Sequence, residues 1–170
     1  MTTLANINFI NVKSSYFHHL EESNILIEDY TKVMEKMIDL KIPSASSWSS
    51  IYFTKWKYKD VTTKVYDIKS DIEDHEKKVN AWVNKATEIY FDTNFPPNLD
   101  NPTMEANYIN QQTFMLNRID QLLRNIQTLY TSINTIISEL RIMRDSAVNA
   151  RRFQIGILIA IFLFGLDLIV

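Results

Sequence analysis

Glycine and proline, the residues that most often interrupt regular secondary structure, are scarce in this chain. Only 2 glycines and 4 prolines occur in 170 residues, against roughly 7% and 5% in average proteins. Both glycines, Gly156 and Gly165, lie near the C-terminus, so residues 1–152 contain none. With so few residues suited to tight turns, we expect long and uninterrupted helices.

Cysteine is absent altogether, so nothing in the sequence points to an oxidising compartment. A strong excess of one charge is also lacking, because 18 Lys and Arg stand against 20 Asp and Glu, for a net charge of −2. This balance argues against nucleic acid as a partner.

The residues that commonly carry catalysis are equally sparse. No glycine lies before residue 156, which excludes Gly-rich phosphate loops and nucleophile elbows from most of the chain. His18 and Glu22 share a helical face, but no further histidine is close in sequence, and His75 falls among apolar positions, where a packing role is expected. We therefore expect no enzyme activity, no cofactor and no metal site.

What the sequence does contain is a long heptad pattern in its last third. Apolar residues recur at alternating steps of four and three, as expected for one face of a helix. The central seam consists of Leu122, Ile126, Leu129, Ile133, Ile136 and Leu140. Asn101 can cap this helix and Pro102 suits its first position, so we expect a helix over about 102–152.

Two further repeats predict two more helices. One repeat runs through Val61, Val65, Ile68, Ile72, His75, Val79, Trp82, Ala86 and Ile89, and the other through Tyr16, Leu20, Ser23, Ile27, Tyr30, Met34 and Met37. We place the corresponding helices at about 15–41 and 47–92. Short connections between them favour an all-α, three-helix antiparallel bundle resembling a coiled coil, over residues 14–152.

Two stretches allow a second interpretation. Residues 47–60 are rich in aromatic and β-branched side chains and could form strands, although one helical face is also present and we favour helix. Residues 1–13 alternate weakly and could form a short strand or an unstructured lead.

The most distinctive feature is the apolar run at the end, FQIGILIAIFLFGLDLIV, over residues 153–170. It is apolar on all faces, and its eighteen residues would cover ~27 Å as a helix, close to the ~30 Å of a bilayer core. We therefore expect the last helix of the bundle to continue into a single C-terminal transmembrane helix, with the lipid bilayer as a partner.

Arginines next to this run indicate its orientation. Arg144, Arg151 and Arg152 lie shortly before it, and the positive-inside rule places such residues on the cytoplasmic side. We expect these arginines to lie at the membrane interface and the helical bundle to be cytoplasmic. Binding of a phosphate-bearing ligand is the alternative role for them.

Three residues within the run have potential roles. Asp167 is a carboxylate in an apolar setting: it is solvated if the protein ends at Val170, and could line a pore if the natural protein continues. Gly156 and Ala160 form a small-xxx-small pair that would let two helices approach closely.

The seam LLRNIQTLYTSINTIISELRIMRDSAVNARRF, leading without a break into the apolar run, resembles the stalk and first span of the CorA-type divalent cation channels. The resemblance covers at most residues 61–170, and the family's Gly-Met-Asn motif does not occur in this chain. It implies a pentameric funnel whose first spans line a pore for an inorganic cation.

Two functions from different classes are thus predicted. The leading one is a non-enzymatic, membrane-anchored bundle that forms homo-oligomers, or docks a partner helix, through the heptad stalk. The alternative is a pore-forming or ion-channel subunit, either a CorA-like cation transporter or an effector that permeabilises membranes, with Asp167 contributing charge to the pore.

Overall fold

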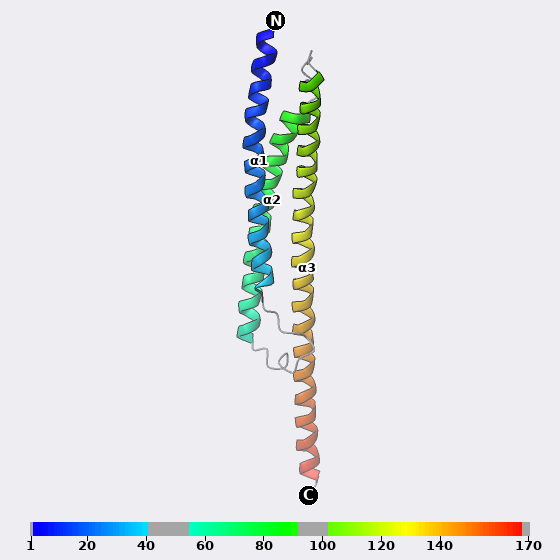
Figure 1. Cartoon of the computed structure of the whole chain (residues 1–170). Coiled ribbons are helices and arrows are strands. Elements are labelled where there is room, and N and C mark those ends of the chain that lie inside the picture. The colour runs from blue at the N-terminus through cyan, green and yellow to red at the C-terminus, as the bar shows by residue number, and fades with distance from the viewer. Residues whose placement is uncertain (1, 41–54, 92–101, 168–170) are drawn as a thin grey trace. The chain divides into compact units, whose positions relative to one another are not determined.

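The computed structural model describes residues 2–40, 55–91 and 102–167, and these residues form three long helices (Figure 1). The helices are α1 (Thr2–Ile38), α2 (Lys55–Phe91) and α3 (Pro102–Asp167). They pack against one another, so the prediction of an all-α three-helix bundle is confirmed. The scarcity of glycine and proline accounts for the length of each helix.

Helix α1 is longer than the periodicity predicted. It starts at Thr2, so the short strand or unstructured lead expected over residues 1–13 is wrong for the described part of that segment. A weak alternation over a few residues does not outweigh the lack of any glycine or proline between residues 2 and 38. The helix ends with a turn in which the amide of Leu40 donates to the carbonyl oxygen of Met37 at 3.2 Å.

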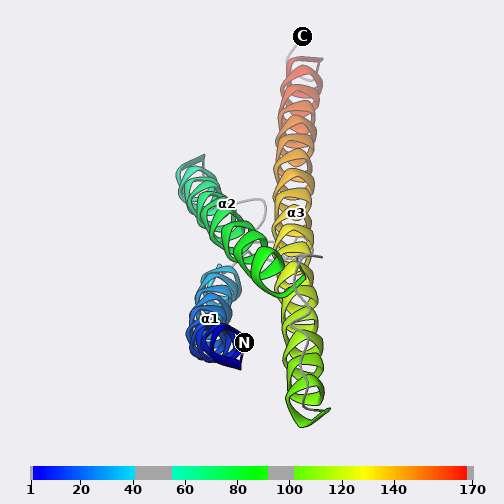
Figure 2. The same ribbon diagram turned by 90° about the horizontal axis from the view of Figure 1, so that it is seen from above.

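Helices α2 and α3 agree more closely with the periodicity. Of residues 47–60, where helix and strand were both considered, those from Lys55 onward are helical, and the earlier ones lie outside the described residues. Helix α3 begins at Pro102, as the capping pattern predicted, and continues past residue 152 to Asp167 as one coil, which is also seen from above in Figure 2.

The chain divides into two compact units, and unit 1 comprises residues 1–36 and 70–130. In unit 1, helices α1 and α2 run antiparallel, because their ion pairs join residues in opposite order. These pairs are Lys36–Asp71 at 2.6 Å, Asp29–Lys78 at 3.1 Å and Glu22–Lys85 at 3.1 Å. Exposed pairs of this kind contribute little stability each, typically below ~1 kcal/mol, so their main effect is on register.

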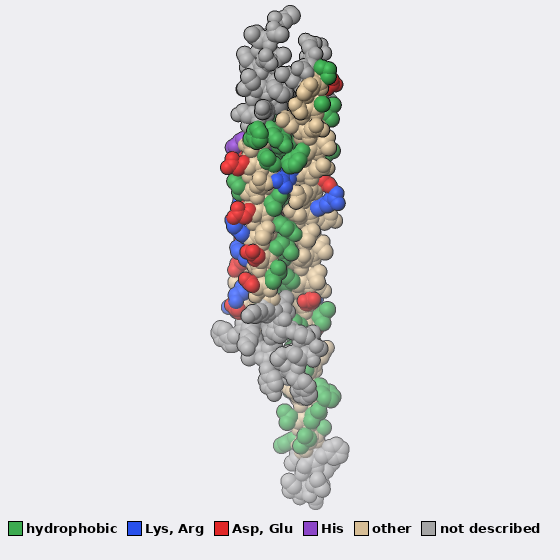
Figure 3. Space-filling model, viewed as in Figure 1, with side chains coloured by type: hydrophobic (Ala, Val, Ile, Leu, Met, Phe, Trp, Pro, Cys, Tyr) green, Lys and Arg blue, Asp and Glu red, His purple; other side chains and the backbone are tan. Residues whose placement is uncertain are grey.

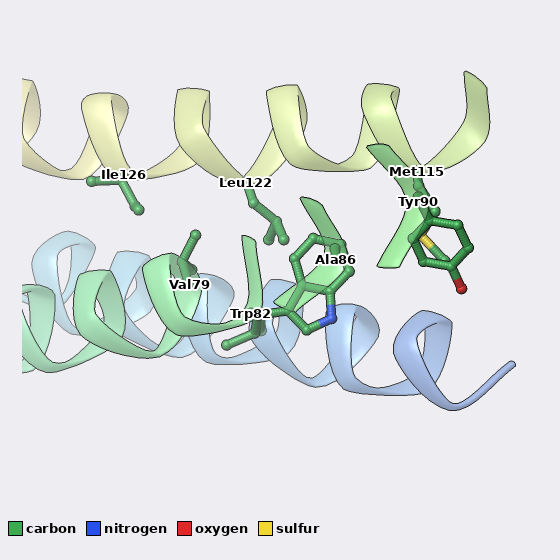
Figure 4. Close-up of a cluster of buried hydrophobic side chains, with 8 residues drawn as sticks. Val79, Trp82, Ala86, Tyr90, Met115, Leu122 and Ile126 are labelled. Carbon is green, nitrogen blue, oxygen red and sulfur yellow. The ribbon is translucent and has the colours of Figure 1, made fainter. Parts of the chain in front are cut away.

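Helices α2 and α3 also run antiparallel within unit 1. The Gln112 amide donates to the Tyr90 carbonyl oxygen at 2.6 Å, and the Tyr130 hydroxyl donates to Glu76 Oε2 at 2.5 Å. Between these two contacts lies the hydrophobic core. Figure 4 shows its labelled members from both helices, which are Val79, Trp82, Ala86 and Tyr90 of α2 and Met115, Leu122 and Ile126 of α3.

Unit 2 comprises residues 37–69 and 131–170 and has a smaller set of buried apolar side chains. Its buried members are Met37, Val65, Ile68, Ile133, Leu140 and Met143. Met37 ends the repeat of α1, and the other five belong to the heptad repeats of α2 and α3, so the same periodicity accounts for the cores of both units.

The expected membrane span is not present in the described part of the chain. Among those residues, no helix is both long and apolar enough to cross a bilayer. The predictions of a C-terminal transmembrane helix and of a single-pass membrane location are therefore wrong, and the cytoplasmic placement of the bundle, which was inferred from that span, loses its basis. Residues 153–167, the part of the run within α3, would cover only about 22 Å, and Asp167 is one of them.

Candidate functional site

The last described side chains of α3 form an exposed apolar surface, which we call the apolar segment, residues 153–162. All ten residues are exposed, and the seven large hydrophobic ones have between 43% and 71% of their surface accessible. These seven are Phe153, Ile155, Ile157, Leu158, Ile159, Ile161 and Phe162. Figure 3 shows hydrophobic side chains gathered along this end of α3.

The apolar segment presents hydrophobic side chains on every side of the helix. Consecutive residues from Ile157 to Phe162 are all apolar and all exposed, and successive helical positions point about 100° apart. Contiguous apolar patches on monomers seldom exceed a few hundred Å², and larger ones commonly mark association sites. The segment is therefore the strongest candidate for a contact surface in the described chain.

Gly156 and Ala160, expected to form a close-packing face, both lie exposed on the apolar segment. A Cβ atom built on Gly156 would meet no other atom within 4 Å. Packing within the described chain therefore does not require a glycine at this position, and a role in close approach would involve another molecule.

The charged residues near the apolar segment are exposed as well. Arg151 and Arg152 immediately precede it, and Arg144 Nε contacts Asp145 Oδ1 at 3.1 Å. Asp167 is the last residue of α3, and its side chain lies outside the described residues. The pore-lining role considered for Asp167 thus stays a prediction.

The heptad seam of α3, which was expected to dock another copy or a partner helix, lies largely inside the bundle. Leu122, Ile126, Leu129, Ile133 and Leu140 are buried and Ile136 is half-buried. Because these side chains are covered within a single chain, the seam is not a free surface for another copy or for a partner helix. Among the described side chains of α3, only the apolar segment offers an exposed surface of comparable hydrophobicity.

Three polar side chains lie inside unit 1, namely His19 and Ser23 on α1 and His75 on α2. The buried face of α1 comprises His19, Ser23, Leu26 and Val33, continuing to Met37. Of the predicted face, Ser23 and Met37 are buried as expected, whereas Tyr16, Leu20, Ile27, Tyr30 and Met34 are only half-buried. Sequence reasoning therefore missed His19, although the spacing from Leu26 through Val33 to Met37 also follows steps of seven and four.

His19 is held between α1 and α2. Trp82 Nε1 donates to the His19 carbonyl oxygen at 3.2 Å, and the His19 ring meets the Tyr90 ring edge-on at 5.9 Å. The imidazole is 2% exposed, and its two nitrogens have no hydrogen-bond partner of normal geometry among the described residues. Burial, followed by the nearby charge of Lys85, lowers the pKa of His19 below its ordinary value of 6.5.

His75 occupies a comparable place further along α2. It is also 2% exposed, and neither ring nitrogen has a hydrogen-bond partner within the described residues. Burial lowers the pKa of His75, while the Asp29 carboxylate raises it by a smaller amount. The expectation that His75 packs in the interior is confirmed by its burial.

Two tyrosines extend this polar interior. Burial raises the pKa of Tyr90 to about 12, and its hydroxyl has no hydrogen-bond partner among the described residues. The hydrogen bond to Glu76 raises the pKa of Tyr130 to about 12. Both phenols are therefore neutral donors across the physiological pH range.

One open groove is lined by residues of α1 and α2. It has a volume of about 440 Å³, and its lining residues are Glu22, Ile25, Leu26, Lys78, Ala81, Trp82 and Lys85. Its two lysines are engaged in ion pairs, Lys78 with Asp29 and Lys85 with Glu22. The groove therefore has little free charge with which to recognise an ion.

The described residues contain no group of three or more His, Asp or Glu side chains that could hold a metal ion. His18 Nε2 and Glu22 Oε1 lie 3.2 Å apart as an exposed pair on α1.

Comparisons of the chain with protein-family models, with curated proteins and with solved structures found no match.

Proposed function

We propose that this chain is a non-enzymatic helical bundle that forms homo-oligomers of more than two copies through the apolar segment. The observation that supports the proposal is the exposure of seven large hydrophobic side chains within ten residues of α3. Burying one Leu, Ile or Phe side chain is worth roughly 1.5–3 kcal/mol, so leaving seven in water is a large cost that association removes.

The apolar segment has hydrophobic side chains on every side of the helix, and this favours several copies of the chain as its binding partners. A groove on an unrelated partner, or one second helix, covers a single stripe and leaves the remaining side chains in water. Several copies of the same segment, packed side by side, can cover most faces of each other. The heptad steps of α3 also continue into the segment as Ile157 and Ile161, which suits parallel packing in register.

This proposal is tested by light scattering coupled to size-exclusion chromatography. The full chain has a mass of 20.0 kDa, and we expect a discrete particle of three or more times that mass at micromolar concentration. The double variant Leu158→Glu with Phe162→Lys should be a monomer, because two charges enter the apolar segment. The new Glu and Lys are four residues apart, an arrangement that supports the helix.

A matched control places the same charges elsewhere on α3. Ile109 and Thr113 are exposed and also four residues apart, so Ile109→Glu with Thr113→Lys should leave the oligomer intact. A monomeric wild-type chain, a dimer, an aggregate without defined stoichiometry, or a charged variant that still assembles would contradict the proposal. Binding to phosphatidylcholine vesicles in place of self-association would identify lipid as the occupant instead.

Salt should strengthen this assembly. Arg144, Arg151 and Arg152 precede the apolar segment on every copy, and parallel packing brings these like charges together. Raising NaCl from about 0.05 to 0.5 M shortens the Debye length from roughly 14 to 4 Å and screens their repulsion. We expect the dissociation constant from sedimentation equilibrium to fall with salt, and a rise would indicate an assembly held by opposite charges.

A further inference from the structure

The two buried histidines form a second feature, independent of the apolar segment. We propose that they make the attachment of α1 to α2 and α3 in unit 1 sensitive to acid, so that α1 separates when the pH falls below the ordinary range of histidine titration. The bundle would then contain one helix, α1, that detaches in acid. The proposal does not rest on oligomerisation, because both histidines lie outside residues 153–162.

Each imidazole fits the interior in its neutral form. Both residues are 2% exposed, and their four ring nitrogens are buried without a hydrogen bond of normal geometry among the described residues, although the Ser15 carbonyl oxygen favours protonation of His19. An imidazolium has two N–H donors and a full charge, and burying it with at most one acceptor is unfavourable. Protonation therefore requires water to reach the ring, which requires the surrounding helices to separate.

The charges around His19 do not offset this cost. The cation of Lys85 on α2 opposes protonation of His19 more strongly than Glu22 on α1 favours it. On α1, the Ser15 carbonyl oxygen also favours protonation and His18 opposes it. Glu22 is already paired with Lys85 at 3.1 Å. From α3, the cationic Arg118 donates to Ser23 Oγ at 3.1 Å, one turn along α1 from His19.

The charges around His75 are similarly balanced. Asp29 of α1 favours the protonated ring and Lys78 of α2 opposes it, but these two side chains are paired with each other at 3.1 Å. From α3, Tyr130 is hydrogen-bonded to Glu76, the neighbour of His75. Asp71 and Asp74, which line the same groove as His75, are paired with Lys36 at 2.6 Å and with Lys77 at 2.9 Å. Each of these carboxylates is thus already paired with a lysine.

Helix α1 is the helix that separates. His19 lies on α1, and His75 lies on α2 near Lys78, which is ion-paired with Asp29 of α1. By contrast, the α2–α3 core contains Val79, Ala86, Met115 and Leu122, all apolar and all fully buried. Acid therefore weakens the contacts of α1 and leaves the apolar contacts between α2 and α3 unaffected.

The direction of the effect follows from linkage. The pKa of each histidine is lower in the folded chain than its ordinary value of 6.5. The stability it contributes is present above pH 6.5 and is lost as the pH falls from there toward the folded pKa. Each histidine can reduce the equilibrium constant for attachment by up to about tenfold per pH unit in this window, and both together by up to about 100-fold between pH 7.5 and 5.5.

Hydrogen exchange with mass spectrometry on the full chain tests this proposal. Protection factors, which correct for the intrinsic pH dependence of exchange, should fall by up to about 100-fold for amides of residues 16–37 between pH 7.5 and 5.5. Amides of residues 115–130 of α3 should stay protected. Unchanged protection of α1, or an equal loss on all three helices, would overturn the proposal.

Histidine variants separate this mechanism from a general effect of acid. His19→Leu with His75→Leu should abolish the pH dependence of α1 exchange above pH 5, whereas His18→Gln should retain it, because His18 is exposed on the same turn of α1. A pH dependence that survives the double substitution, or disappears in the His18 variant, would contradict it. Circular dichroism at pH 7.5 verifies folding, and the wild-type measurement stands if the double variant does not fold.

Discussion

Replacing Leu122 by alanine is expected to lower the free energy of unfolding by about 2–5 kcal/mol, the range for Leu→Ala in well-packed cores. Leu122 is fully buried on α3 and belongs to the cluster that also contains Val79 and Ala86 of α2. Removing its isobutyl group leaves a cavity between two long helices, which cannot close by moving one side chain alone. Because the bundle depends on this seam, the loss is a large fraction of its stability.

The adjacent residue provides the control for this prediction. Leu123 has the same side chain on the same turn of α3, but 43% of its surface is exposed, against 0% for Leu122. Leu123→Ala should therefore change stability by less than ~1 kcal/mol. Urea denaturation followed by circular dichroism, at one fixed protein concentration, measures both variants. Equal losses from the two substitutions would show that the two leucines share one environment, against the structure.

Replacing Trp82 by alanine should cost a similar amount, about 3–5 kcal/mol. The indole is 5% exposed in the unit 1 core, and its Nε1–H bonds the carbonyl oxygen of His19 at 3.2 Å. The substitution therefore removes core volume and a connection from α2 to α1. Trp82→Phe keeps most of the apolar volume and removes the donor, so a smaller loss of roughly 1–3 kcal/mol is expected.

An exposed aromatic residue on α2 serves as the comparison for Trp82. Tyr66 is 66% exposed, and Tyr66→Ala should alter the free energy of unfolding by less than ~1 kcal/mol. The two Trp82 variants and the Tyr66 variant can be compared by the same urea titration. If Trp82→Phe were as damaging as Trp82→Ala, the hydrogen bond to α1 would dominate over the packing of the indole.

Periodicity predicted α3 more successfully than α1. The buried positions Leu122, Ile126 and Leu129 follow a strong repeat of aliphatic residues, and they are inside the bundle as expected. On α1 the repeat was shorter and included the polar Ser23, and the inward face contains His19 in place of Leu20. When the repeat is weak, packing against neighbouring helices sets which face of a helix points inward. The sequence of that helix alone does not specify those contacts.

The apolar run shows a second limit of the sequence. Its hydrophobicity was evident, but hydrophobicity alone does not distinguish a membrane span, a buried core helix and an association surface. The structure excludes the first for the described residues and leaves residues 153–162 exposed. The resemblance to CorA-type channels rested on the same run and on the stalk, and it stays a prediction without support from the comparisons.

By itself, the sequence determined that the protein consists of long helices and where the α3 seam lies, because these follow from local properties. The scarcity of glycine and proline and the heptad spacing act between residues a few positions apart. Only the tertiary structure decided that His19 enters the interior and that residues 153–162 of α3 have no cover in the described chain. Those outcomes depend on which surfaces meet from helices distant in sequence, and no local pattern contains that information.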